Sequence, residues 1–218
     1  MSLQLHFVTD DRLPFDRTRD VVAVAVDAGV DVVQLRVKGG TARDLLAQTV
    51  ALSDVVAGRA LFVVDDRVDI VFAARDAGAR VDGVHLGQGD LPPQSARRLL
   101  GDDALIGWTA HTPAHLAAAA AFPAGTLDYL GVGVIRPTST KPDHPPALGV
   151  EGFGVLAAAT TLPCIAIGGI GLDDVAPLRD AGAAGIAVVS LLSAADDPAE
   201  AARALRRAAD ATAVEVAR

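Results

Sequence analysis

Residues Asp27–Lys38 have the sequence DAGVDVVQLRVK, and this stretch holds the pattern that decides the fold. Its first three residues end a helical pattern, and the apolar run that follows is typical of a buried strand. Glycine tolerates the left-handed backbone that ends a helix, so Asp-Ala-Gly predicts a tight helix-to-strand turn. The same three residues recur at Asp76–Gly78 and Asp180–Gly182, each time before another strand-like run. We therefore expect a reused scaffold turn at the bottom of a sheet.

Short apolar runs alternate with amphipathic stretches along the whole chain. The expected strands are Leu3–Thr9, Asp31–Arg36, Leu61–Val64, Gly83–His85, Leu105–Thr109, Tyr129–Gly133, Cys164–Ile167 and Gly185–Val189. The expected helices are Arg17–Ala28, Ala42–Ala57, Val68–Ala77, Pro93–Leu100, Pro113–Ala121, Glu151–Ala159, Asp173–Ala181 and Pro198–Ala211. Eight strands, each followed by a helix, predict a (β/α)8 TIM barrel. An open doubly wound sheet is the alternative, and it is disfavoured because no Gly-rich fingerprint follows the first strand.

Composition limits the class of protein further. A length of 218 residues suits one α/β barrel, so we expect residues 1–218 to form a single domain. The net charge of −8 disfavours a nucleic-acid partner. The single cysteine, Cys164, stands in an apolar run and is expected to be a small buried hydrophobe. No signal peptide or membrane-spanning segment is found, so we expect a cytoplasmic protein without a membrane partner. Whether the chain forms a homo-oligomer stays open.

Lysine usage indicates where the chemistry lies. The chain has seventeen Arg but two Lys, Lys38 and Lys141, and both follow predicted strands. Barrel enzymes build their sites at this rim, and lysine offers a compact charge that suits phosphate. Period-two alternation places Gln34, Arg36 and Lys38 on one side of the second strand. Polar groups that point into a barrel are costly without partners, so they predict a bound anion, with an inward ion pair as the alternative.

Carboxylates and glycines follow other predicted strands. Asp66 and Asp90 stand at the tips of adjacent strands and could share one Mg²⁺, which prefers oxygen ligands. Capping of the following helices is the alternative for both. Gly168 follows the seventh strand and Val189–Ser190 the eighth, where barrels frequently bind phosphate through backbone N–H groups. The long loop 134–146 follows the sixth strand and is expected to be functional.

Six strings occur in a fixed order along the chain. They are QLRVK at 34–38, DDRVD at 65–69, DGVHLGQGD at 82–90, GVG with PTSTK within 131–141, AIGGI at 166–170 and GIAVVS at 185–190. Together they resemble the thiamine phosphate synthase (thiamine-phosphate pyrophosphorylase) family over nearly the whole chain. The resemblance implies a (β/α)8 barrel and a transferase that joins hydroxymethylpyrimidine diphosphate to thiazole phosphate and releases pyrophosphate.

The resemblance also implies a role for each matching residue. Asp66 and Asp90 would bind Mg²⁺ on the diphosphate, and Gln34 would contact the pyrimidine. The diphosphate itself would be held by Arg36, Lys38, Lys141 and the hydroxyl of Thr109. The thiazole phosphate would be bound by Thr138, Thr140 and the backbones of Gly168, Val189 and Ser190. Asp65 would lie beside the pyrimidine, either as a further carboxylate near the metal or as an acceptor for the pyrimidine amino group.

The implied reaction is a dissociative alkyl transfer. Diphosphate leaves the pyrimidine methylene carbon, the aminopyrimidine ring stabilises the cation, and the thiazole nitrogen attacks. No strong protein base is needed, so rate enhancement would come from charge stabilisation and from alignment of two bound reactants. Whether the thiazole partner is carboxylated stays open.

Several positions depart from the family pattern. They are Val37 for Glu, Asp65 for Asn, Thr109 for Ser with the bulky Trp108 before it, and Val134 and Arg136 in the long loop. Two other functions stay open, and the departures at Asp65, Val134 and Arg136 motivate the second of them. A thiazole tautomerase of the same barrel family would use His111 as its proton carrier and would need no metal. A non-catalytic binder or sensor of thiamine precursors would bind phosphorylated ligands without turnover.

Overall fold

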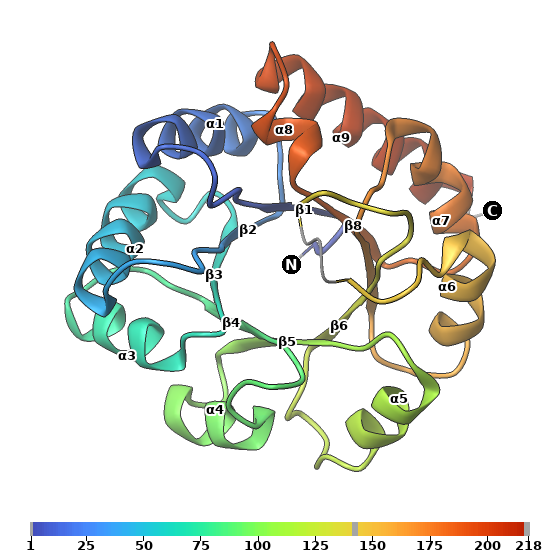
Figure 1. The fold of residues 1–218 in the computed structure, drawn as a ribbon, viewed down its shortest axis with the longest axis horizontal. Coiled ribbons are helices and arrows are strands. Elements are labelled where there is room, and N and C mark those ends of the chain that lie inside the picture. Colours follow the sequence, from blue (N-terminus) through green and yellow to red (C-terminus); the bar gives the residue numbers. More distant parts are fainter. Residues whose placement is uncertain (1, 141–143, 216–218) are drawn as a thin grey trace.

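In the computed structural model, which describes residues 2–140 and 144–215, eight parallel strands form one closed barrel. The strands pair in chain order, and the last pairs with the first (Figure 1). They are β1 (Leu5–Val8), β2 (Val32–Leu35), β3 (Leu61–Asp65), β4 (Gly83–Leu86), β5 (Leu105–Thr109), β6 (Tyr129–Gly133), β7 (Cys164–Ile167) and β8 (Gly185–Val188). The predicted (β/α)8 barrel is confirmed, and the open doubly wound sheet is excluded.

Helices form an outer ring around the strands (Figure 1). They are α1 (Phe15–Asp27), α2 (Ala42–Val56), α3 (Val68–Asp76), α4 (Pro93–Leu100), α5 (Pro113–Ala120), α6 (Gly149–Ala157), α7 (Val175–Asp180), α8 (Ser190–Ser193) and α9 (Pro198–Glu215). The helix predicted at Asp173–Ala181 is divided into a 3-10 turn, η1 (Leu172–Asp174), and α7. α8 was not predicted, because one helical turn is too short to show a periodic pattern.

Two hydrophobic layers fill the molecule. The larger lies between the strands and the helices, as expected for strands buried on both faces. Inside the barrel, one small cluster holds Val32, Leu61 and Val63, and another holds Val8, Tyr129, Ile165 and Ala187. Leu3 and Leu105 pack against both clusters. The barrel interior is therefore a packed floor rather than a pore, and a ligand has room only above it.

The repeated Asp-Ala-Gly turns are the scaffold turns that the sequence predicts. Gly29, Gly78 and Gly182 have φ values of 94°, 86° and 95°. After α1, the N–H of Val30 donates to the carbonyl of Ala25, at 3.1 Å, and Gly29 donates to Val26, at 3.0 Å. This pair of hydrogen bonds is the Schellman motif, which satisfies carbonyls that the helix end leaves open. The chain enters the next strand directly from it.

Three aspartates join neighbouring strands at the bottom of the barrel. Each precedes an even-numbered strand and accepts a hydrogen bond from the backbone N–H of the strand before it. The pairs are Leu5 with Asp31 (2.9 Å), Phe62 with Asp82 (2.7 Å) and Ile106 with Asp128 (2.7 Å). Half-buried arginines pair with two of these carboxylates, Arg206 with Asp31 and Arg97 with Asp128. This end of the barrel is thus fixed by scaffold contacts.

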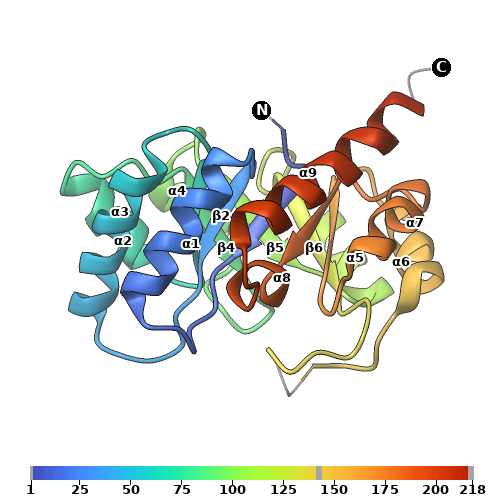
Figure 2. The same ribbon diagram turned by 90° about the horizontal axis from the view of Figure 1, so that it is seen from above.

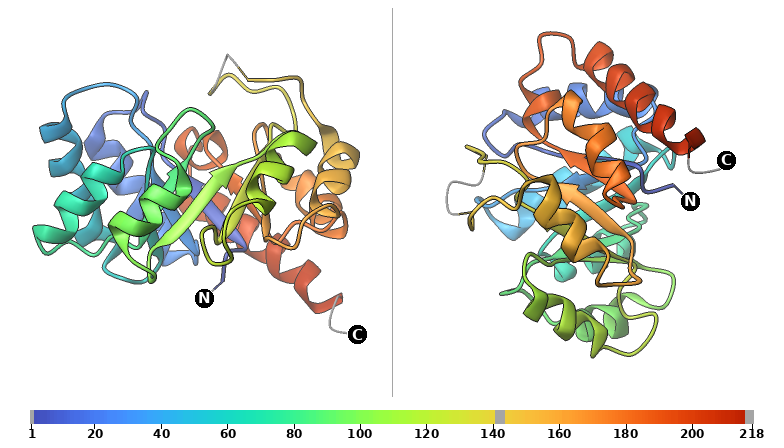
Figure 3. Two further views of the ribbon diagram at one scale, coloured as in Figure 1. Left: turned by 90° about the horizontal axis from the view of Figure 1, so that it is seen from below. Right: turned by 90° about the vertical axis from the view of Figure 1, so that its right-hand side faces the viewer.

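The opposite end of the barrel carries the long loop between β6 and α6. Figures 2 and 3 show this loop at the end away from the segment that enters β1 and from the last turn of α9. The carboxyl ends of all eight strands open towards the loop's side, which is where TIM-barrel enzymes place their sites. None of the described helices combines the length and apolar character needed to span a bilayer.

We predict that Asp128→Ala lowers the free energy of unfolding by about 2 kcal/mol, because it leaves the buried N–H of Ile106 without its acceptor and removes the carboxylate that pairs with Arg97. Equilibrium denaturant unfolding measures this loss. Asp102→Ala is the matched control, since Asp102 is exposed in a nearby loop and its removal should change stability by less than about 0.5 kcal/mol. Equal stability of the two variants would contradict the scaffold role of Asp128.

Candidate active site

A cleft of about 680 Å³ opens at the carboxyl ends of the strands. All eight strands or the loops after them contribute residues to its lining. Twelve of the residues singled out in the sequence line it: Gln34, Arg36, Lys38, Asp65, Asp66, Asp90, Thr109, Thr138, Thr140, Gly168, Val189 and Ser190. Lys141 lies outside the described residues. The fold thus brings together side chains that are widely spaced in the sequence.

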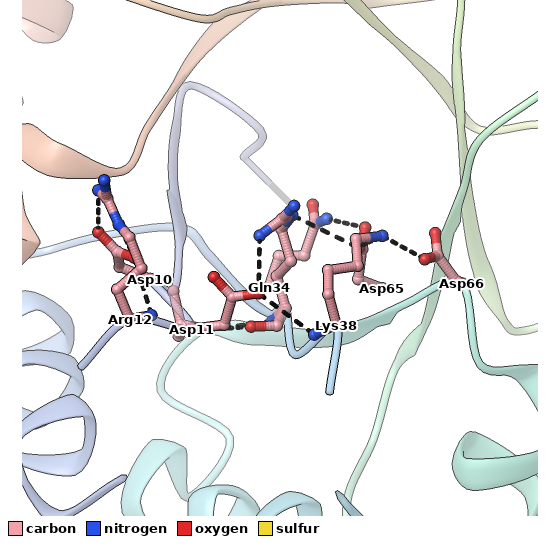
Figure 4. A network of polar contacts seen from close by, with 9 residues as sticks. Asp10, Asp11, Arg12, Gln34, Lys38, Asp65 and Asp66 are labelled. Atoms are coloured by element: carbon pink, nitrogen blue, oxygen red, sulfur yellow. Dashed lines mark hydrogen bonds and ion pairs between the residues drawn. The ribbon is translucent and has the colours of Figure 1, made fainter. Parts of the chain in front are cut away.

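Asp65 is the centre of a polar network between β2 and β3 (Figure 4). Gln34 Nε2 donates to Asp65 Oδ1 at 2.7 Å, and Lys38 Nζ lies 2.8 Å from Asp65 Oδ2. Arg36 Nε lies 3.8 Å from the same oxygen, and the Asp65 side chain is 9% exposed. The inward ion pair expected as an alternative is therefore present. The cations of this ion pair, Lys38 and Arg36, also line the cleft. An ion pair in the free protein is therefore compatible with the binding of an anion there.

Burial and the neighbouring opposite charges shift the pKa values of Asp65 and Lys38 in opposite directions. Burial and the neighbouring Asp66 raise the pKa of Asp65, while Lys38 and Arg36 lower it in part. Burial also disfavours the charge on Lys38, but Asp65 and Asp66 outweigh it and raise the pKa of Lys38. Lys38 is accordingly charged at neutral pH and is held beside two carboxylates. An anion that enters the cleft must compete with these carboxylates for Lys38.

Asp11 contacts the same cations from the loop after β1 and was not singled out in the sequence. Its Oδ2 lies 3.2 Å from Arg36 Nη1 and accepts a hydrogen bond from the Lys38 backbone N–H at 3.3 Å. Figure 4 shows Asp11 directed towards this group. The available signal was its place just after the first strand, at the rim shared by all strand ends. The sequence does not show where the Arg36 side chain lies, so the position of Asp11 alone did not distinguish it from Asp10.

Asp66 and Asp90 meet at the tips of β3 and β4. Asp66 has a φ of 62°, and its N–H donates to the carbonyl of His85 at 2.8 Å. A left-handed conformation outside glycine is uncommon and concentrates at functional sites. Asp90 accepts from the N–H of Gly87 at 2.6 Å. Neither carboxylate caps a helix, since the residues at the N-caps of α3 and α4 are Arg67 and Pro92, so that alternative is wrong.

The two carboxyl groups share a hydrogen bond. Burial works against the charge on Asp66, but hydrogen bonds with Lys38 and Asp90 outweigh it and lower its pKa. Burial and the bond to Asp66 raise the pKa of Asp90, which favours Asp90 over Asp66 as the holder of the proton in this hydrogen bond. A divalent cation suits the place of this proton because both oxygens already face it. Among the described residues, no group of three or more His, Cys, Asp or Glu side chains forms a metal cluster, so remaining ligands would come from substrate and water.

The opposite side of the cleft is formed by the β6–α6 and β7–α7 loops. The carbonyl of Gly168 accepts hydrogen bonds from Ile135 at 3.1 Å and Arg136 at 3.0 Å. A Cβ on Gly168 would lie 2.5 Å from Val134 Cγ1, and its φ is 96°. Glycine is therefore required for loop packing at this position. α8 begins directly after β8, and Val189 and Ser190 line the cleft there.

Arg136, one of the departures from the family pattern, fastens the long loop. Its Nε lies 2.9 Å and 3.0 Å from the two oxygens of Asp174 in η1, and Nη2 also contacts Asp174. The Arg136 hydrogen bond lowers the pKa of Asp174 and keeps it ionised. Asp174 in turn accepts from the N–H of Gly171 at 2.8 Å. The pair joins the loop that carries Thr138 and Thr140 to the β7–α7 loop.

The structure also accounts for Trp108. Its ring is buried outside the barrel against Phe122, with 5.4 Å between centroids, and Nε1 donates to the carbonyl of Gly87 at 3.2 Å. The neighbouring Thr109 faces the cleft, so the bulky residue does not enter the site. His111 lines the rim and packs edge-on against His115.

Three further side chains line the cleft although the sequence did not single them out for chemistry: His85, Gln88 and His144. Gln88 Nε2 donates to the carbonyl of Thr109 at 2.5 Å, and His144 Nε2 accepts from the N–H of Thr138 at 3.3 Å. His85 was expected to be packed or structural, and it is buried with hydrogen bonds to Tyr129 and Thr109.

Cations beside paired carboxylates at the C-terminal rim define a TIM-barrel enzyme that acts on phosphorylated small molecules. The family model described as thiamine monophosphate synthase matches residues 5–192. The chain therefore belongs to the thiamine monophosphate synthase family. As a member it is a transferase that joins the pyrimidine and thiazole moieties into thiamine phosphate.

Individual relatives agree with the family match. The chain is 46% identical to a thiamine-phosphate synthase of Albidiferax ferrireducens, covering 96% of this chain and 93% of that protein. It is 47% identical to a thiamine-phosphate synthase of Corynebacterium efficiens, with 94% of each covered. The solved thiamine phosphate pyrophosphorylase from Pyrococcus furiosus superimposes with a TM-score of 0.82, at 30% identity and 96% coverage of both chains.

We predict that Arg136→Met speeds hydrogen exchange at the amides of Thr138 and Thr140 about five-fold. Without this pair the loop opens locally more often, so its amides exchange faster. Exchange read by mass spectrometry measures it. Arg203→Met is the control, because it breaks a comparable exposed pair with Glu200 on α9, far from the loop. Unchanged exchange in the Arg136 variant would show that the pair does not hold the loop.

Proposed function

We propose that this cleft expels pyrophosphate from hydroxymethylpyrimidine diphosphate, with Mg²⁺, and joins the pyrimidine to thiazole phosphate. The observation that carries the proposal is the arrangement at the β2, β3 and β4 tips. There Lys38 and Arg36 lie beside the paired carboxyl groups of Asp66 and Asp90, in a cleft closed below by packed side chains. Cations and a carboxylate pair in one place suit a metal-bound diphosphate.

The diphosphate end would be held from several strands. Asp66 and Asp90 would hold Mg²⁺, which when bound supplies charge stabilisation for the departing diphosphate. Arg36 and Lys38 would turn from Asp65 to the phosphate oxygens. The Thr109 hydroxyl would donate to the same group, and Lys141 would approach it from the β6–α6 loop. These fixed charges favour the leaving group as its negative charge develops, so they lower the barrier to departure.

The pyrimidine would lie above the barrel floor beside Gln34 and Asp65. Gln34 donates its amide to Asp65, which leaves its carbonyl oxygen to accept from the pyrimidine. Asp65, held in place by Gln34, would accept from the pyrimidine amino group rather than bind the metal. Electron density on the aminopyrimidine ring then stabilises the cation that forms when diphosphate leaves.

The thiazole phosphate would bind across the cleft. Thr138 and Thr140 would donate hydroxyls, and the backbones of Gly168, Val189 and Ser190 would donate N–H groups, as the loops after strands seven and eight do in many barrels. Holding the thiazole nitrogen against the methylene carbon makes the second step effectively unimolecular. We further propose that residues 1–218 act as one domain in the cytoplasm on these small molecules alone.

The test of this function is synthesis of thiamine phosphate from the two substrates, detected as fluorescent thiochrome after oxidation. We predict product with Mg²⁺, none with EDTA, and recovery when Mg²⁺ is added in excess, because Asp66 and Asp90 require the metal to bind the diphosphate. Circular dichroism with EDTA controls for unfolding. Equal turnover in EDTA would overturn the metal assignment, and no turnover by folded protein with Mg²⁺ would overturn the proposed function.

Lys141→Ala is predicted to lower kcat by ~10²–10³, the loss typical of one preorganised charge at a developing anion. Ser139→Ala is the matched control in the same loop, since Ser139 is exposed. Steady-state kinetics on both variants decide the role of Lys141. A variant with near-native kcat would remove Lys141 from the mechanism.

Asp65→Asn tests the competition for Lys38. The amide still accepts from Gln34 but loses the charge that holds Lys38 and Arg36. We predict that KM for the pyrimidine diphosphate falls about three- to ten-fold, which corresponds to roughly 1 kcal/mol of released pairing. Asp69→Asn, which removes an exposed carboxylate paired with Arg67 on α3, should leave KM unchanged. A KM that rises in Asp65→Asn would mean that its charge assists binding.

A further inference from the structure

Tyr129, His85 and Thr109 form a hydrogen-bonded column from the barrel floor to the cleft. Tyr129 Oη lies 3.1 Å from His85 Nδ1, and His85 Nε2 lies 3.1 Å from Thr109 Oγ1. Tyr129 is 1% exposed and His85 9%. Gly107 gives them space, since a Cβ there would lie 2.2 Å from Tyr129 Cζ and 2.5 Å from His85 Nδ1. The glycine at this position of the inner wall thus leaves the space that both side chains occupy.

The direction of the hydrogen bonds follows from the donor at the bottom. Burial raises the pKa of Tyr129, so its hydroxyl keeps its hydrogen. Within residues 2–140 and 144–215, His85 Nδ1 is the partner available to that hydroxyl. A buried hydroxyl without an acceptor is costly, so Tyr129 donates to Nδ1. An accepting Nδ1 carries no hydrogen, which places the ring hydrogen on Nε2. His85 then donates to Thr109 Oγ1.

We infer that Tyr129 and His85 are positioning residues that make the Thr109 hydroxyl donate into the cleft. Because Oγ1 already accepts from His85, its own hydrogen is left to point towards a bound anion. With the other tautomer, Thr109 would donate to His85 and present lone pairs to the diphosphate. The inference rests on the proposed contact between Thr109 and the diphosphate, and adds two residues that act through Thr109.

A double-mutant cycle on kcat tests the inference. Tyr129→Phe keeps the ring and removes the donor, and Thr109→Val removes the hydroxyl that the column directs. We expect Tyr129→Phe alone to lower kcat about ten-fold with KM for thiazole phosphate unchanged, and to have no further effect in the Thr109→Val background. In a Thr138→Val background, at the other side of the cleft, the effect of Tyr129→Phe should persist in full. A merely structural role would lower kcat equally in all three backgrounds.

The outcomes distinguish a failure of this inference from a failure of the proposed function on which it rests. If Thr109→Val has native kcat, the proposed contact with the diphosphate is wrong. If Thr109→Val is slow but Tyr129→Phe is native, or the two effects multiply, the inference alone is wrong. The native protein offers a test that needs no folded variant. Nitrogen-15 NMR of the His85 ring should show hydrogen on Nε2 and a bare Nδ1, and the reverse tautomer or a doubly protonated ring would overturn the column's direction.

Discussion

The site depends on one buried carboxylate, Asp65, at the tip of β3. A carboxylate at 9% exposure is stable only with partners, and Gln34 and Lys38 supply them from the neighbouring strand. These contacts hold the long side chains of Gln34 and Lys38 in one conformation. The cationic group is therefore in place above the barrel floor before a ligand binds. The same contacts oppose the binding of anions. An anion binds only if it interacts with Lys38 more favourably than Asp65 and Asp66 do. A diphosphate carrying a divalent cation meets that condition by satisfying both the lysine and the acidic pair.

The two ends of the barrel divide stability from function. At the bottom, Schellman turns and the aspartates before even-numbered strands satisfy the backbone, and Arg97 and Arg206 neutralise two of those carboxylates. At the top, Asp66 has a left-handed backbone, and its carboxyl group lies in hydrogen-bond contact with that of Asp90. Strain of this kind persists where the surrounding structure holds it, and it is common at functional sites. The packed floor and the bottom contacts provide that support.

Much of this could be predicted from the sequence, for physical reasons. Alternating strands and helices can close only a few architectures, and all parallel strands end at one rim, so Gln34 and Asp90 were expected in one site although 56 residues separate them. The features that the sequence did not predict depend on the three-dimensional path of the chain. α8 is too short for periodicity, and the pairing of Arg136 with Asp174 joins loops whose path the sequence does not give. Strand alternation places Trp108 outside the barrel, because it lies in β5 next to the inward Thr109. The role of Asp11 does not follow from alternation, because Asp11 lies in the loop after β1.

The central claim is that Lys38 exchanges its carboxylate partners for the diphosphate while Asp66 and Asp90 bind Mg²⁺. A crystal structure of the protein with Mg²⁺ and pyrophosphate tests it most directly. We expect pyrophosphate in the cleft, Lys38 Nζ and the Arg36 guanidinium within hydrogen-bond distance of its oxygens, and the metal between Asp66, Asp90 and the ligand. Pyrophosphate bound elsewhere, or Lys38 still paired with Asp65 beside a bound pyrophosphate, would contradict the account.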